Sequence, residues 1–154
     1  MKRDLATALP ALLPRAVAWA EVQSQQALRY GTRLNSQGSA LASRVGVQRP
    51  EHIRVAIVAA LPFPEDPELR AAALETGLLG PGMVGLTLGY AVFVCQGHEA
   101  DSRLLSHEFR HVYQYEAAGS IQQFLPVYLS QMVEFGYEHA PLEVDARAHE
   151  ILYA

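Results

Sequence analysis

Apolar and polar positions divide the chain into a helical first part, two strand-like segments and a helical last part. Residues 11–45 are rich in Ala, Leu, Gln and Arg, which favour helix, while Gly31 and Gly38 weaken the middle of this segment. The pattern there predicts either two helices or one bent helix. Residues 52–59 and 83–94 are rich in β-branched side chains and partly alternate, which predicts a strand in each.

Glycine and proline residues mark where the remaining elements begin and end. Four further helices are expected, over residues 68–75, 103–118, 121–135 and 141–153. Gly119 ends the second of these helices, and Pro126 lies inside the third, where a kink is expected. Gly85 and Gly89 interrupt the second predicted strand, which indicates a bulge or a close approach of backbone.

The chain is expected to form a single α+β domain over residues 1–154. Half of its residues are hydrophobic, which is enough for a core of its own, and it contains no evident repeat or domain boundary. The net charge of −4 argues against nucleic acid as a partner, because phosphate binding needs a clustered positive surface.

The N-terminus is expected to be neither a signal peptide nor a membrane anchor. Residues 1–3 provide a basic start, but Asp4 follows them, Pro10 and Pro14 interrupt the apolar run, and Arg15 ends it. No apolar run approaches the length of about 18 residues that a transmembrane helix needs. We therefore expect a cytoplasmic protein without a membrane partner.

Cys95 is the single cysteine of the chain, and this limits the available metal chemistry. It cannot form an intramolecular disulfide, and a zinc site built from several thiolates is excluded. Any metal ion must therefore be held by histidine and carboxylate side chains.

Residues 107–111 read His-Glu-Phe-Arg-His, the pattern H-E-x-x-H, within the predicted helix 103–118. Helical residues four apart lie only about 40° apart around the axis, so the imidazoles of His107 and His111 can reach the same ion. Glu108 lies about 100° from His107, beside the metal, where it can take a proton from water. The pattern predicts a catalytic type of site for one Zn²⁺ ion.

A catalytic zinc ion needs a third protein ligand and one open position. The metzincin pattern would place a histidine where Ala117 stands, and Glu116 lies about 140° from His111 on the far side of the helix. The remaining candidates follow later in the chain: Glu134, Glu138, His139, Glu143, Asp145, His149 and Glu150.

Glu143 is the favoured third ligand. Pro141 places it in the first turn of its helix, and the small Ala146 lets this helix approach the His107 helix closely. The alternative is an acidic residue that only stabilises a helix N-terminus through the helix dipole.

The H-E-x-x-H of residues 107–111, followed by the E-x-x-A of residues 143–146, resembles the gluzincin metallopeptidases, especially their compact minigluzincin-like forms. The resemblance covers about residues 83–150. It implies a small zincin-like domain with a short sheet ending in an edge strand, then the zinc-binding helix and two further helices. Residues 83–154 would be the metal-binding half, preceded by an N-terminal helical region over residues 1–50.

The resemblance also implies roles for individual residues. It makes His107, His111 and Glu143 the zinc ligands and Glu108 the general base. In that family an extended peptide substrate pairs with the edge strand, which here lies within residues 85–94.

Larger gluzincins carry a Tyr or His that steadies the oxyanion, in a region after the glutamate helix that this sequence lacks. The side chains that could take this role, or support a ligand from a distance, are Tyr137, His139, His149, Tyr153, Arg110 and Tyr113. Asp145 could orient a ligand imidazole through a hydrogen bond. These alternatives stay open at the level of the sequence.

Two functions are expected from these residues. The first is a zinc-dependent peptidase that hydrolyses a peptide or protein substrate with water activated by Glu108. The second is a non-catalytic zinc-binding structural or protein-interaction domain that retains the zincin fold, in which zinc holds the His107 helix against the Glu143 helix.

Overall fold

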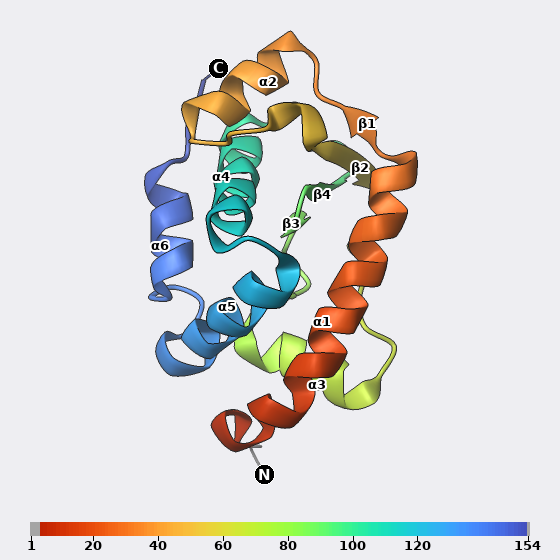
Figure 1. The fold of residues 1–154 in the computed structure, drawn as a ribbon, viewed down its shortest axis with the longest axis vertical. Helices are drawn as coiled ribbons and strands as arrows, with labels where there is room; N and C mark the ends of the chain where they lie inside the picture. Colours follow the sequence, from red (N-terminus) through yellow and green to blue (C-terminus); the bar gives the residue numbers. More distant parts are fainter. Residues whose placement is uncertain (1–3, 154) are drawn as a thin grey trace.

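The computed structural model describes residues 4–153, which form six α-helices, one 3₁₀ turn and one four-stranded sheet (Figure 1). In chain order the elements are α1 Leu5–Tyr30, β1 Thr32–Arg33, α2 Ser36–Arg44, η1 Pro50–His52, β2 Arg54–Val58, α3 Pro67–Thr76, β3 Gly85–Leu88, β4 Ala91–Cys95, α4 Ser102–Ala118, α5 Ile121–Phe135 and α6 Pro141–Ala148. This content confirms the α+β class. The basic start over residues 1–3 lies outside the described residues.

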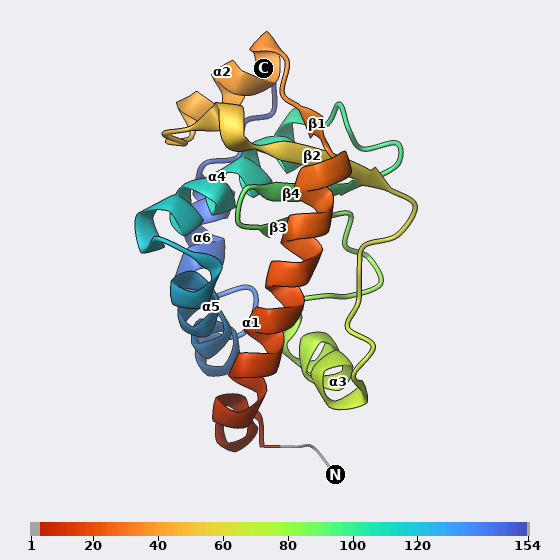
Figure 2. The same ribbon diagram turned by 45° about the vertical axis from the view of Figure 1, so that its right-hand side comes forward.

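The sheet has the strand order β1-β2-β4-β3, so that β3 forms one edge. β2 and β4 are parallel, and the other two pairs are antiparallel. Side chains alternate between the two faces: Leu86, Leu88 and Phe93 belong to a core cluster with α1, whereas Val92 and Val94 belong to a cluster with α2 and α4. Figure 2 shows α1 crossing the sheet on the side away from α4.

The prediction of one strand over residues 83–94 is wrong in one respect, because this segment is a hairpin. Leu88 pairs with Ala91, and Gly89 adopts a φ of 68° in the two-residue turn between them. The edge strand is therefore β3 alone, and β4 lies inside the sheet between β2 and β3.

The helix bounds confirm most expectations and correct two of them. The first segment is two helices, and α1 begins earlier than expected because the Asp4 carboxylate accepts the Thr7 N–H as an N-cap. α6 ends at Ala148 instead of continuing to 153. The chain leaves the helix there and binds α4, where the Ile151 N–H donates to Ser106 and the Glu150 carboxylate accepts from Arg103.

Among the described residues, α1 is the one helix long and apolar enough to cross a membrane. Core helices of soluble proteins and N-terminal signal sequences also meet this criterion of length and hydropathy. The buried residues of α1, such as Ala16 and Ala20, pack in the core cluster that contains β3 and β4. The expectation that no segment is long and apolar enough to cross a membrane is therefore wrong for α1, whose mean hydropathy just meets the criterion. The cytoplasmic location stays a prediction.

Candidate metal centre

Helix α4 presents two buried histidines on one face. It begins at the N-cap Asp101, whose carboxylate accepts the Leu104 N–H, and it ends at Gly119, which has a φ of 111°. Between these caps, the rings of His107 and His111 lie edge to face with their centroids 4.9 Å apart. The H-E-x-x-H segment is thus one regular helical turn with both imidazoles on the same side.

Glu143, in the first turn of α6, contacts both imidazoles. Its Oε1 lies 3.1 Å from His107 Nε2, and its Oε2 lies 3.0 Å from His111 Nε2. The three residues are between 2% and 8% exposed, and one ligand atom of each lies within 4.8 Å of the others. The Tyr128 hydroxyl donates to Glu143 Oε2 at 2.6 Å and so fixes the carboxylate from α5.

This donor set fits a zinc ion. Zinc binds imidazole nitrogen and carboxylate oxygen at about 2.0–2.2 Å, which gives a tetrahedron with edges of about 3.3 Å. The observed Nε2 to carboxylate separations of 3.0 and 3.1 Å run to different Glu143 oxygens and are hydrogen bonds that an ion would replace, while one ligand atom of each residue lies within 4.8 Å of the others. Three protein ligands also leave a fourth position open, as catalytic zinc sites require. His107, His111 and Glu143 could therefore hold a metal ion.

The opposite nitrogen of each ring is held by an acceptor. His107 Nδ1 lies 2.8 Å from Glu150 Oε2, and His111 Nδ1 lies 2.8 Å from Gln114 Oε1. In a neutral imidazole these contacts place the proton on Nδ1, so the lone pair is on Nε2, which faces Glu143. Once a metal ion displaces the proton from Nε2, these acceptors therefore favour the tautomer that the metal ion needs.

The three ligands favour the charged forms of one another before any metal binds. Burial opposes the charged form of His107, but its hydrogen bond with Glu143 and the nearby Glu108 carboxylate raise its pKa to about 9. The pKa of His111 is raised for the same reasons. Burial alone would raise the pKa of Glu143, but hydrogen bonds from both histidines hold it well below its usual range. A metal ion that binds Nε2 displaces these protons.

The edge strand β3 holds the carboxylate of Glu108. The Thr87 hydroxyl donates to Glu108 Oε1 at 2.8 Å. A Cβ added at Gly85 would lie 3.1 Å from Glu108 Oε2 and 2.8 Å from Leu104 Cδ1. Glycine at position 85 therefore makes room for the predicted general base, which confirms a close approach at this residue.

Gly85→Ala is expected to lower the free energy of unfolding by about 1–3 kcal/mol, because the added methyl group overpacks the space against Leu104 and Glu108. Gly82→Ala is the matched control, since a Cβ there would meet no atom within 4 Å, and its effect should stay within about 0.5 kcal/mol. Urea unfolding of both variants measures the difference. Equal stability of the two would contradict the close packing of Glu108 on β3.

A largely apolar pocket lies at this edge of the sheet, with a cavity volume of about 80 Å³. Side chains from α1, α3 and α5 form its walls, among them Leu12 and Trp19 of α1. The metal-binding residues and Glu108 line the same pocket. The candidate metal centre is thus enclosed by the N-terminal helix on one side.

β3 lines this pocket and has main-chain groups that do not pair with β4. The Cys95 N–H donates to the Val84 carbonyl at 2.9 Å, and hydrogen-bonded pairs alternate along an antiparallel ladder. The main-chain groups of Gly85 and Thr87 therefore point away from β4, toward the outer edge of the sheet. The Tyr115 hydroxyl donates to the Thr87 carbonyl at 3.3 Å.

Asp145 does not take the position expected for it. Its carboxylate accepts hydrogen bonds from Arg110 Nε and Gln114 Nε2, and no hydrogen bond joins it to a ligand imidazole. The prediction of a direct contact is therefore wrong, because Gln114 stands between Asp145 and His111. His149 Nδ1 lies 2.8 Å from the Asp145 carbonyl oxygen, at the C-terminal end of α6.

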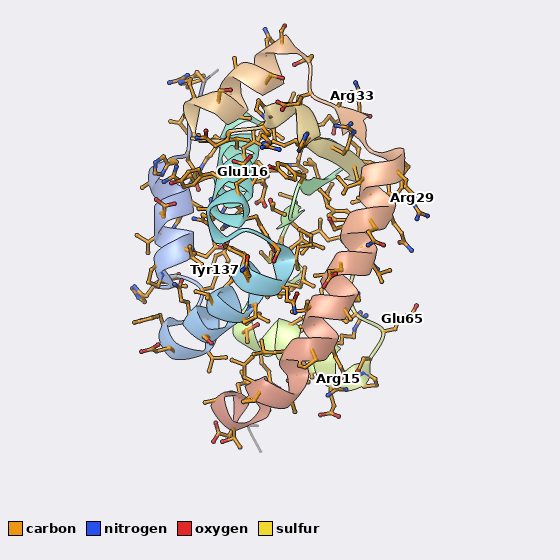
Figure 3. The ribbon with its side chains drawn as sticks, in the orientation of Figure 1. Arg15, Arg29, Arg33, Glu65, Glu116 and Tyr137 are labelled. Carbon is orange, nitrogen blue, oxygen red and sulfur yellow. The ribbon has the colours of Figure 1, made fainter. Side chains whose placement is uncertain are left out.

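The other predicted side chains divide into one that reaches the pocket and several that do not. Tyr137 lines the pocket, beside α5 and α6 (Figure 3). Tyr153 is 88% exposed and His139 is also exposed, and neither lines the pocket. Glu116, labelled in the same figure, accepts hydrogen bonds from the Gln48 N–H and the Tyr90 hydroxyl, so it is not directed at the metal ligands, as expected.

Three residues of the site were not predicted in their observed roles. Glu150 was considered as a ligand, but its carboxylate instead accepts from His107 Nδ1. Neither Tyr128 nor Gln114 was identified from the sequence as part of the site. Gln114 follows His111 by three residues, so helical spacing puts the two side chains within reach, and this signal could have identified it.

No known protein family, curated protein or solved structure matches this chain. The resemblance to gluzincins therefore stays an expectation that depends on the two motifs.

Proposed function

We propose that the protein is a zinc-dependent peptidase of the gluzincin kind, with a zincin-like fold. The observation that carries this proposal is the convergence of His107, His111 and Glu143 in one buried pocket that also contains Glu108. Two imidazole nitrogens and one carboxylate oxygen with an open fourth position are the ligand set of the His₂Glu catalytic zinc sites.

The residues around the metal centre would have separate roles in hydrolysis. Zinc, when bound, supplies Lewis acidity and lowers the pKa of water. Glu108, oriented by Thr87, accepts the proton of the attacking water and returns it to the leaving amine. The outward-facing main-chain groups of Gly85 and Thr87 are suited to pair with an extended peptide, as in other cases where a peptide adds a strand to a sheet edge.

An extended peptide can reach this edge only if the first turns of α1 move away, because side chains of α1 wall the pocket. The zinc-loaded protein is nevertheless expected to cleave members of a denatured-protein or peptide library. A chelator should stop the cleavage, and added zinc should restore it. Cleavage that continues at full rate in the chelator would contradict the proposal.

The size of the pocket favours the second candidate, a non-catalytic zinc-binding structural or interaction domain. A buried water needs about 10–15 Å³ of such volume, so a cavity of about 80 Å³ holds only a few waters and no stretch of peptide. In this case zinc would join α4 to α6 and stabilise the fold without turnover.

Removal of zinc with a chelator is expected to lower the melting temperature by about 5–10 °C. Zinc at 100 times its Kd stabilises the folded state by about 2.7 kcal/mol, and a domain of this size shifts by about 2–4 °C per kcal/mol. Scanning calorimetry with and without chelator measures the shift. Both candidate functions require it, and an unchanged melting temperature would contradict both. The peptidase additionally requires zinc-dependent cleavage.

A further inference from the structure

Gln114 connects two of the three metal-binding residues. Its Oε1 lies 2.8 Å from His111 Nδ1, on the same helix. Its Nε2 donates to the Leu142 carbonyl and to Asp145 Oδ2, both at 2.9 Å, and so reaches α6. Leu142 directly precedes Glu143. One buried side chain therefore contacts a histidine ligand and the backbone beside the carboxylate ligand.

The partners of Gln114 leave its amide only one orientation. The Leu142 carbonyl and the Asp145 carboxylate can only accept hydrogen bonds, so both require the NH₂ group on their side. Arg110 supports this arrangement, because it donates to both Asp145 carboxylate oxygens and to the Val45 carbonyl. The amide oxygen must then face His111, where it accepts from Nδ1–H, so that Nε2 is the nitrogen that remains for a metal ion.

Helix α6 depends on such contacts because it has no side-chain N-cap of its own. Ala140 occupies the N-cap position and makes no capping hydrogen bond. Instead, the Leu142 N–H donates to Gln131 Oε1 from α5 at 2.9 Å, while the Leu142 carbonyl accepts from Gln114. Two glutamines from two different helices thus hold the first turn of α6, which carries Glu143.

We propose that Gln114 is a positioning residue of the metal centre: its amide oxygen sets the tautomer of His111, and its amide nitrogen fixes the turn of α6 that carries Glu143. This inference depends on the metal centre proposed above. Gln131 performs only the second task, since it has no contact with a histidine ligand among its hydrogen bonds. The two glutamines therefore form a matched pair for an experiment.

The test measures zinc affinity by chelator competition, together with the visible absorption of the Co²⁺-substituted protein. Gln114→Met should weaken zinc binding by about 10–100-fold, the usual effect of losing a group that orients a ligand, and should alter the Co²⁺ spectrum. Gln131→Met should weaken binding by less than about tenfold and leave the spectrum unchanged. A purely structural role for Gln114 predicts the same result for both variants, and that outcome would overturn the proposal.

A charge-neutral exchange separates the two tasks. In the double variant Gln114→Glu with Asp145→Asn, the new carboxylate still accepts from His111 Nδ1 but can no longer donate to the Leu142 carbonyl, and the net charge of the pair is unchanged. Its zinc affinity should fall less than that of Gln114→Met, because the contact with His111 is kept. A loss as large as that of Gln114→Met would overturn the role of the His111 contact.

Folding and metal binding are separated by the choice of measurement. Circular dichroism checks that each variant is folded; if Gln114→Met is not, Gln114→Asn replaces it, because the shorter side chain withdraws the amide oxygen from His111. A wild-type protein that binds no zinc would contradict the metal centre itself. A folded Gln114→Met variant that binds zinc as tightly as the wild type would contradict only the role of Gln114.

Discussion

Glu143→Ala is expected to reduce zinc affinity by more than about 100-fold. This is more than the usual effect of removing a group that only hydrogen-bonds to a metal ligand. Glu143 is 2% exposed and its two oxygens contact both histidine nitrogens, so its removal takes away the carboxylate that faces both imidazoles. The variant should also lose stability. Its cavity leaves the Tyr128 hydroxyl buried without its acceptor, which costs about 1–3 kcal/mol.

Glu134→Ala is the matched control for this prediction. Glu134 was also a candidate for the third ligand, but its side chain is exposed on α5. Zinc titration followed by calorimetry should give the same affinity for Glu134→Ala as for the wild type. Undiminished zinc binding by Glu143→Ala would show that the third ligand is a different group.

Glu108→Gln is expected to lower peptide hydrolysis by about 10²–10⁴-fold, the usual contribution of general acid–base catalysis. The amide is close in size to the carboxylate, and its oxygen can still accept the hydrogen bond of the Thr87 hydroxyl. The side chain therefore keeps its place against Gly85 but cannot take a proton. Zinc content should equal that of the wild type, because Glu108 does not belong to the ligand cluster.

The comparison for this variant is Glu134→Gln, which removes one exposed carboxylate and leaves the pocket unchanged. Initial rates on one fluorogenic peptide, measured for the three proteins at equal zinc content, give the answer. Equal rates for Glu108→Gln and the wild type would rule out Glu108 as the base. Equal inactivity of all three on a broad peptide library would favour the structural role of zinc.

Local interactions explain which parts of the fold could be predicted. The bounds of α4 and α5 follow from signals within a few residues, such as the N-cap Asp101 and the terminating Gly119. The hairpin was missed because residues 83–94 are apolar on both sides of Gly89, and both strands are buried. The end of α6 was missed because distant contacts decide it: Glu150 and Ile151 bind α4 instead of extending the helix.

The difference between local and distant interactions also explains which residues of the site could be predicted. His107 and His111 lie one helical turn apart, so their spacing alone predicted that they share a face, with Glu108 beside them. Glu143 was chosen from seven candidates by its place in a helix, and the structure brings it to both histidines. The supports come from other elements: Tyr128 from α5 and Glu150 from the C-terminal segment. Spacing along the chain carries no information on such partners.

One zinc ion is expected to bind between α4 and α6. The zinc content of the protein, after loading with excess zinc and extensive dialysis, is compared with that of the double variant His107→Ala and His111→Ala. We expect one zinc ion per wild-type chain and none in the double variant, because the two imidazoles are two of the three ligands. A wild-type chain that leaves dialysis without zinc, or a double variant that retains as much, would contradict this expectation.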